Sequence, residues 1–349
     1  TAWVTKLLPP VVIGPTVALI GLSLCGSAVN NLNNTAAGSY NLVAILVGLI
    51  AFFITVFASV KGTQSMKMVP FIIGILGAYV IALILTFIGR ASGCEALQLV
   101  KLSAFDNVQL FKVPRFTFLG MFGAYKDATN TIGSASDVLS LFVLFAPVAF
   151  VTLAEHIADH ENLSSIIGHD LITDPGLDRT LLGDGLATAF AGMFGGPANT
   201  TYGENTGVLA LSRVYDPRVI RLAALYAIIL SFSPKFDALV NSIPTAIVGG
   251  VSFVLYGMIS AVGVRNVVEN RVDLTKSRNL IIAAVIFVCG LGFASTGGIT
   301  FTVGSADITL TGLAIAALAG VILNAVLPGN DYEFGKSVEG DASADLGSY

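Results

Sequence analysis

The chain has 349 residues, of which 54% are hydrophobic and 11% are charged, and its formal net charge is −4. Soluble domains usually carry about 25% charged residues, so this composition excludes an ordinary water-covered surface and indicates an integral membrane protein. The small net charge excludes the basic surface of most nucleic-acid-binding proteins, and we expect no nucleic-acid partner. Three scattered cysteines, Cys25, Cys94 and Cys289, fit neither a disulfide framework nor a cysteine metal site. We expect no cofactor.

Apolar runs close to the ~20 residues of a full crossing predict the membrane-spanning helices. In chain order the predicted runs are Pro10–Ala28, Asn41–Val60, Val69–Ile88, Val138–Ala158, Arg218–Phe232, Ile243–Val262, Leu280–Phe293 and Leu310–Leu327. A further interrupted pair of segments is predicted between Leu181 and Arg213, where a Gly/Ala-rich run is followed by Gly195-Gly196-Pro197. Because a backbone in lipid must satisfy its own hydrogen bonds, we predict an all-α polytopic membrane protein with roughly ten crossings.

Lysine and arginine indicate the orientation, because positive charges accumulate in short cytoplasmic connections. If the N-terminus faces the cytoplasm, the connection that holds Arg271, Lys276 and Arg278 lies inside. The connections Asn30–Tyr40 and Ala294–Asp307 carry no lysine or arginine and lie outside. This alternation holds only if the interrupted pair counts as two crossings.

The polar stretch Asn199–Arg213 interrupts this otherwise apolar pattern. Ala198–Tyr202, extended at about 3.3 Å per residue, and Gly203–Arg213, helical at about 1.5 Å per residue, together span roughly 33 Å, against the ~30 Å of the hydrocarbon core. Gly203 and Glu204 are therefore predicted at mid-depth, at a helix N-terminus. Free N–H donors beside a carboxylate acceptor suit a planar ligand with alternating N–H and C=O groups. Uracil is such a ligand.

Glu155 follows the apolar segment Phe142–Ala154, where a carboxylate is costly and therefore indicates function. Asp159 lies four residues later, on the same helical face. Two carboxylates in a low dielectric raise each other's proton affinity, which would allow the pair to couple a proton to a substrate. The alternatives are that Glu155 snorkels to the cytoplasmic end of its helix, that Asp159 lies in the interface, and that Glu204 merely occupies a favourable first-turn position.

His156 and His160 are also four residues apart, and Glu161 follows them. Paired histidines on one helical face can bind zinc, which leaves a membrane metalloprotease as an alternative of a different class. The His-Glu-x-x-His order of zinc peptidases is missing from this sequence. We therefore expect a protein that is not an enzyme and holds no metal.

The segment Tyr202–Arg213 resembles the signature of the nucleobase–ascorbate transporters, also called the nucleobase–cation symporter-2 family. The signature positions are supplied by Glu204, Asn205, Gly207 and Arg213, with Ser212 where threonine is usual. Asn199–Gly203 is similar to the uracil-permease branch, and Ala154-Glu155-His156 is similar to the motif of the family's other substrate-binding acid. The resemblance extends from about Trp3 to Leu327.

This resemblance implies a fold of two inverted repeats of seven helices each, with discontinuous helices, a core domain and a gate domain, often as a homodimer. It implies that Glu155 and Glu204 accept hydrogen bonds from the uracil N–H groups and that the Gly203 backbone donates to a ring carbonyl, with Tyr202 beside them. Thr201, Asn205 and Gly207 are expected to be structural residues of the site. The resemblance also implies proton symport, for which Glu155 and Asp159 are the candidate residues. Asp159 matches a variable position.

The predicted domain ranges combine the resemblance with the apolar runs. They are gate helices of the first repeat at 1–90, an extracytoplasmic loop at 91–137, core helices with the substrate site at 138–216, mainly gate helices at 217–327, and a disordered tail at 328–349. If the second repeat starts near Val138, only three crossings precede it, so the first repeat is incomplete. We interpret the chain as an N-terminally truncated member, and whether it transports by itself stays open.

The working hypothesis is a multi-pass uracil/proton symporter of the cytoplasmic (inner) membrane that works by alternating access. Its partners would be a nucleobase, a coupling proton and membrane lipid. The sequence leaves open a permease for xanthine or another nucleobase, coupling to sodium instead of protons, and a receptor that binds uracil without transporting it.

Overall fold

The computed structural model describes residues 8–33, 40–106, 108–113, 167–202, 205, 209, 214–303 and 306–329, and in part the stretch between them from 141 to 164 (141–142, 145–146, 149, 152–153, 155–157, 159–160 and 163–164), with no side chains for 301–309. The chain forms two compact units. Unit 1 comprises Thr1–Ser23, Phe116–Thr206 and Met258–Tyr349, and unit 2 comprises Leu24–Arg115 and Gly207–Gly257. The division cuts across the predicted domain ranges, whose core and gate assignment stays a prediction.

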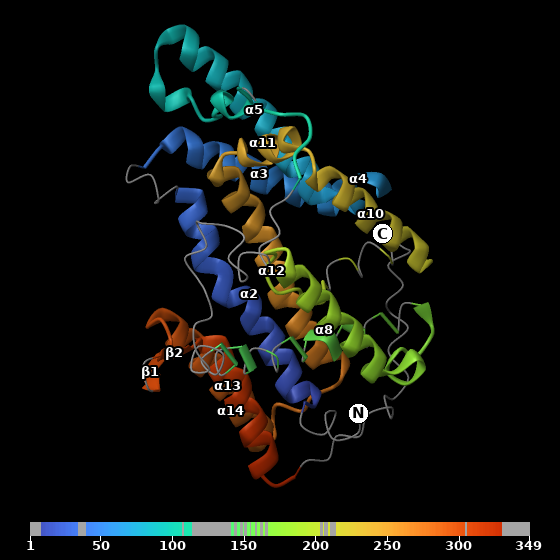
Figure 1. The fold of residues 1–349 in the computed structure, drawn as a ribbon. Helices are drawn as coiled ribbons and strands as arrows, with labels where there is room; N and C mark the ends of the chain where they lie inside the picture. The colour runs from blue at the N-terminus through green and yellow to red at the C-terminus, as the bar shows by residue number, and fades with distance from the viewer. Residues whose placement is uncertain are drawn as a thin grey trace. The chain divides into compact units, whose positions relative to one another are not determined.

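Both units are built mainly from apolar helices (Figure 1). Unit 2 holds the end of α2 (Pro10–Asn33), α3 (Leu42–Lys61), α4 (Gln64–Met68), α5 (Pro70–Ser92), the 3₁₀ turns η2 (Glu95–Leu97) and η3 (Leu102–Phe105), α10 (Pro217–Ser231), α11 (Pro234–Asn241) and the start of α12 (Thr245–Glu269). Unit 1 holds the start of α2, the π-helical turn η4 (Ile172–Gly176), α8 (Leu177–Met193), the end of α12, α13 (Ser277–Ser295), strands β1 (Ile299–Val303) and β2 (Ala306–Leu310), and α14 (Gly312–Val326).

The helices of unit 2 begin and end at residues that the sequence marks. The Asn41 side chain accepts hydrogen bonds from the Val43 and Ala44 N–H groups and caps α3. Pro70 opens α5, where a missing N–H costs no hydrogen bond, and Gly93 ends it in the left-handed conformation at φ 69°. The Thr86 hydroxyl then accepts from the Leu99 and Val100 N–H groups, so the start of the predicted outer loop is fastened back onto α5.

Small residues let the helices of unit 2 approach closely. The side chains buried between α3 and α5, which lie side by side in Figure 1, include Ala51, Ala78 and Ala82. The α3–α12 contact is closer still, because the Gly250 backbone meets the Gly48 carbonyl with no room for a Cβ between them. Without a hydrophobic effect between helices in lipid, such contacts provide much of the packing energy.

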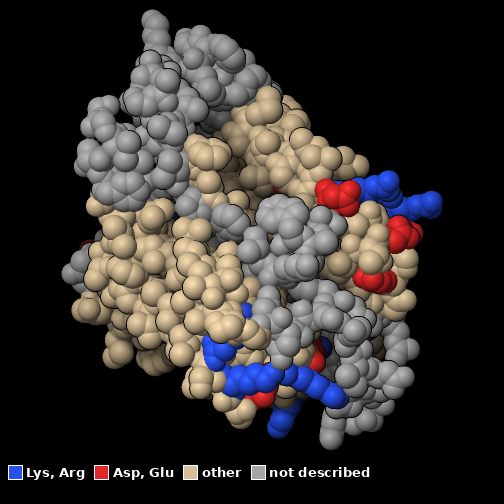
Figure 2. Space-filling model, turned by 90° about the horizontal axis from the view of Figure 1, so that it is seen from below, with Lys and Arg blue, Asp and Glu red and all other residues tan. Residues whose placement is uncertain are grey.

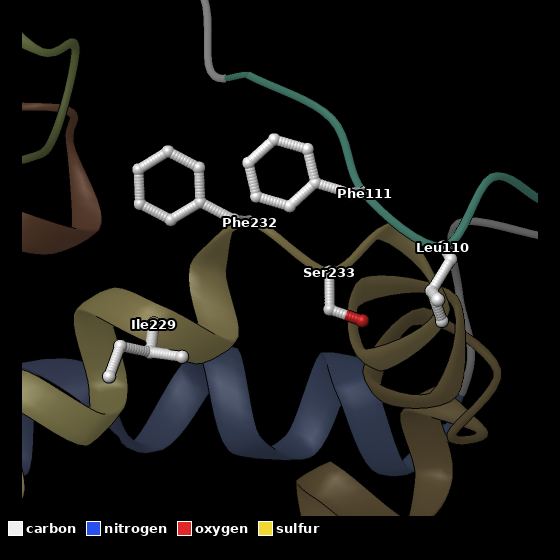
Figure 3. Close-up of a pocket in the computed structure, with 5 residues that line it drawn as sticks. All are labelled: Leu110, Phe111, Ile229, Phe232 and Ser233. Carbon is white, nitrogen blue, oxygen red and sulfur yellow. The ribbon is translucent and has the colours of Figure 1, made fainter.

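A sharp bend separates α10 from α11, with an angle of 93° between them. Pro234 opens α11, and a proline disfavours helical geometry at the residue before it, here Ser233. Phe232 at the bend stacks on Phe111 with ring centroids 5.5 Å apart, and the Lys112 N–H donates to the Phe232 carbonyl at 3.0 Å. Together with Leu110, Ile229 and Ser233, the two rings line an apolar cavity of about 290 Å³ (Figure 3). The predicted run Arg218–Phe232 gave no sign of the second, bent helix.

In unit 1, α13 and α14 pack against each other and are joined by the hairpin β1–β2, in which Ile299 pairs with Leu310 and Val303 with Ala306. Gly297 and Gly298 turn the chain out of α13 at φ 82° and 91°. The sequence predicted a plain connection from Ala294 to Asp307. Ile299, Thr300, Thr302 and Val303 are β-branched and favour a strand, and their backbone groups pair across the hairpin.

Five described helices are long and apolar enough to cross a membrane, namely α2, α3, α5, α12 and α13, and the bent pair α10–α11 makes six if it is counted as one span. On the face seen in Figure 2 most of the described surface carries neither acidic nor basic side chains. The predicted all-α polytopic class is confirmed, with the hairpin as an addition. The predicted tail and most of the outer loop lie outside the described residues.

The Gly48–Gly250 contact generates a stability prediction. We expect Gly250→Ala to destabilise the fold by about 1–3 kcal/mol, because the added methyl group must push two backbones apart. Gly257→Ala adds the same group to the same helix where nothing lies within 4 Å, so it should be neutral or stabilising by up to about 1 kcal/mol. Thermal unfolding of both variants in detergent measures the difference, and equal melting temperatures would contradict the close contact.

Candidate substrate and proton site

Three segments of unit 1 meet around the predicted residues Glu155 and Thr201. Every described residue from 141 to 164 is helical, and this helical stretch carries Glu155, His156, Asp159 and His160. Helix α8 follows, and the chain then runs without regular secondary structure from Gly196 to Tyr202. Because all three segments belong to one unit, the distances between their side chains define a single local arrangement.

The irregular segment is described as far as Tyr202, and the predicted helix start at Gly203 lies outside the described residues. The next described residue after Tyr202 is Asn205, which is helical and donates its N–H to the Tyr202 carbonyl at 3.3 Å. Upstream, the Thr188 hydroxyl of α8 donates to the Asn199 carbonyl at 3.2 Å. Gly203, Glu204 and Gly207 lie outside the described residues, so their predicted roles stay predictions. The Tyr202 side chain is about half exposed.

Glu155 is bonded to the irregular segment. Its Oε2 accepts a hydrogen bond from the Thr200 hydroxyl at 2.6 Å, across 45 residues of sequence. A hydroxyl donor to a carboxylate fixes the direction of the side chain. The structure therefore brings one of the two predicted acids to the segment that leads into the other.

His156 links all three segments and is almost fully buried, with 3% of its surface exposed. Its Nδ1 lies 2.9 Å from the Thr201 hydroxyl and 3.6 Å from an Asp184 carboxylate oxygen, and its Nε2 lies 2.9 Å from the Thr180 hydroxyl. The Thr180 hydroxyl is within reach of the Leu177 carbonyl at 3.3 Å, to which it can donate. It is then free to accept from Nε2–H, while Nδ1 accepts from Thr201. This set of bonds fits the neutral Nε2–H tautomer.

His160 completes a stacked pair of rings. Its ring centroid lies 4.0 Å from that of His156, and its Nδ1–H donates to the His156 carbonyl at 2.8 Å. Among the described residues, no group of three or more His, Cys, Asp or Glu side chains is placed to hold a metal ion. Both nitrogens of His156 face hydroxyls, so the pair is arranged for hydrogen bonding, which argues against the metalloprotease alternative.

Asp159 is 6% exposed, so its carboxyl lies inside unit 1 and away from the open surface. Its predicted role in proton coupling stays a prediction. The contact of Thr201 with His156 is of the kind expected for a structural residue. The sequence did not predict the hydrogen bond between His156 and Thr180 or the approach of Asp184 to His156. The one available signal was the spacing of Thr180 and Asp184, two polar residues four apart on one face of an apolar segment.

Comparison with known proteins identifies the family of the chain. The family model described as "Permease family" (Xan_ur_permease) matches residues 1–299. The chain is 41% identical over 327 residues to the uracil permease of Bacillus caldolyticus, which covers 94% of this chain and 69% of that protein. It is 39% identical over 332 residues to the uracil permease of Bacillus subtilis, covering 94% and 70%. It is 33% identical over 326 residues to a probable uracil permease of Haemophilus influenzae, covering 93% and 70%.

The hydrogen bonds of His156 can be tested through Thr180. We expect Thr180→Val to destabilise the protein by about 1–3 kcal/mol, because the variant leaves a buried ring nitrogen without its partner. Thr188→Val removes a hydroxyl from the same helix at an exposed position and should cost well under 1 kcal/mol. Thermal unfolding in detergent compares the two, and a larger loss in Thr188→Val would show that the His156 contact is unimportant.

Proposed function

Because the chain belongs to the Permease family, we propose that it is a secondary active transporter that moves uracil together with a proton. It is a multi-pass integral protein of the cell membrane, with several helices long enough to cross it. The observation that carries the proposal is the hydrogen bond between Glu155 and Thr200. It joins an acid on one helix to the irregular backbone that precedes Glu204, which is the architecture that secondary transporters use for substrate sites at mid-depth.

The chemistry of uracil matches the groups that this architecture offers. The uracil ring presents two N–H donors and two carbonyl acceptors along its edge. Glu155 and Glu204 would accept from the N–H groups, and the Gly203 N–H at the predicted helix start would donate to a carbonyl. Tyr202 would lie beside the ring. The Thr200 hydroxyl bonds to Glu155, and the neighbouring His156 is held by the Thr201 hydroxyl, so hydrogen-bonding groups that an uncharged ring could use surround the carboxylate.

Proton coupling would reside in Glu155 and Asp159. One turn separates them, and Asp159 is buried, where a second negative charge is costly. A proton taken up by this pair would lower that cost and would be released when the site opens to the other side. The remaining elements of the mechanism are alternating access by a core domain moving against a gate domain, two inverted repeats, and a homodimer. These elements are proposed on the family resemblance.

The role of Glu204 is tested by binding. We expect Glu204→Ala to weaken uracil binding by about a hundredfold or more, because it removes a charged hydrogen-bond acceptor, and Glu204→Gln by about tenfold, because the amide still accepts. Glu269→Gln changes an exposed carboxylate that is paired with Arg265 and should bind normally. Titration of purified protein with uracil, thymine and xanthine measures this and identifies the nucleobase by the largest rise in melting temperature. Unchanged uracil affinity in Glu204→Ala would refute the site.

The coupling proposal is tested by uptake into proteoliposomes. Glu155→Gln cannot exchange a proton at this position, so we expect it to lose accumulation driven by an inward proton gradient while it still exchanges substrate at equal concentrations. Glu269→Gln again serves as the control. Gradient-driven uptake that survives in Glu155→Gln would remove this residue from coupling. Uracil binding without any exchange by the parent chain would indicate a receptor.

A further inference from the structure

We propose that unit 1 binds the phosphate headgroup of an anionic membrane lipid in a basic pocket between the start of α2, the end of α12 and the start of α13. The pocket has a volume of about 210 Å³. Its lining combines an apolar wall with polar and charged groups: Pro9, Pro10, Val11, Asn270, Arg271, Val272, Asp273, Lys276, Arg278 and Asn279. All of these residues belong to unit 1.

The charge of the lining favours an anion. Three cationic side chains face one carboxylate, Asp273, which leaves a net formal charge of +2. The Asp273 carboxylate also accepts hydrogen bonds from the Thr275 N–H at 2.9 Å and the Thr275 hydroxyl at 2.6 Å. Part of its acceptor capacity is therefore used within its own turn. A phosphate group would find more cationic charge here than the protein itself neutralises.

Arg278 provides a fixed positive charge in the pocket wall. Its Nη2 donates to the Asn324 carbonyl at 3.0 Å and to the Asn324 side-chain oxygen at 2.8 Å, and its Nε donates to the Leu327 carbonyl at 3.3 Å. These bonds hold the guanidinium against the end of α14 and satisfy carbonyls that have no partner in that helix. The acceptors are neutral, so they orient the charge without cancelling it.

Arg271 occupies a backbone position that glycine usually fills. Its φ is 48°, which makes it the one residue other than glycine with a positive φ in the described part of the chain. The Arg271 N–H donates to the Val268 carbonyl and the Val272 N–H to the Val267 carbonyl, both at 3.0 Å, which is the hydrogen-bond pattern of a Schellman cap at the end of α12. A side chain in this conformation costs free energy that glycine would avoid. Arg271 lines the pocket in spite of this cost.

The depth of the pocket points to lipid as the source of the phosphate. Helices α2, α12 and α13 contain 24, 25 and 19 residues, so at about 1.5 Å per residue they reach roughly 28–37 Å, enough to cross the hydrocarbon core. Their ends accordingly lie at the level of the headgroups. Basic pockets between spanning helices on the cytoplasmic side are suited to anionic headgroups, and Pro9, Pro10 and Val11 would contact the glycerol and acyl carbons.

The test compares lipid-dependent stability in Arg271→Gly and Arg265→Gln. Melting temperatures are measured in detergent with increasing phosphatidylglycerol or phosphatidylcholine. We expect phosphatidylglycerol to stabilise the parent chain more strongly, and Arg271→Gly to weaken this effect about fivefold in apparent affinity, since one cation near the surface contributes about this factor. In phosphatidylcholine, Arg271→Gly should melt at the same or a higher temperature, because the strained backbone is relieved. Arg265 pairs with Glu269 outside the pocket, so Arg265→Gln should respond as the parent does.

Three results would overturn the proposal. The first is an equal loss of the phosphatidylglycerol effect in both variants, which indicates diffuse attraction of anionic lipid to any cation. The second is an undiminished effect in Arg271→Gly. The third is the same stabilisation by inorganic phosphate in phosphatidylcholine, which assigns the pocket to a free anion.

Discussion

The hydrogen bonds between threonine hydroxyls and the two residues Glu155 and His156 are the interactions on which the candidate site depends. In a membrane protein, backbone that leaves helical geometry must find partners inside the protein, because lipid offers none. The stretch from Gly196 to Tyr202 is attached through the side chains of consecutive threonines: Thr200 donates to Glu155, and Thr201 contacts His156. Thr188 adds a bond to the Asn199 carbonyl from α8. These short side chains attach an irregular segment to two helices.

Such an arrangement also determines what the site can hold. A carboxylate that already accepts from Thr200 has a fixed direction. The neutral tautomer of His156 adds no charge beside it. The groups gathered here are a carboxylate, hydroxyls and a neutral ring, all of which form hydrogen bonds. This physical property connects the local geometry to the permease relatives.

The helices of unit 2 are held together by the close packing of small residues. Gly48 and Gly250 bring two backbones into contact, and alanines fill the space between α3 and α5. In unit 1, two cationic side chains lie at helix ends. There Arg278 bonds to the last carbonyls of α14, and Arg271 closes α12 in a left-handed conformation. Small residues thus serve the helix contacts of unit 2, whereas in unit 1 hydroxyls attach the irregular segment and cations lie at helix ends.

Local composition was enough to predict the class of protein and the course of most helices. The predicted runs Asn41–Val60 and Val69–Ile88 nearly coincide with α3 and α5, since a run of apolar residues long enough to cross lipid has few alternatives to a helix. The motif around Glu204 indicated the family for the same reason: its residues are contiguous. Only the tertiary structure decided that His156 meets Thr180 and Thr201, which are 24 and 45 residues away. It also decided that α10 bends into α11 and that a hairpin joins α13 to α14. Contacts of this range depend on how distant segments pack, and a single sequence carries no local signal for that.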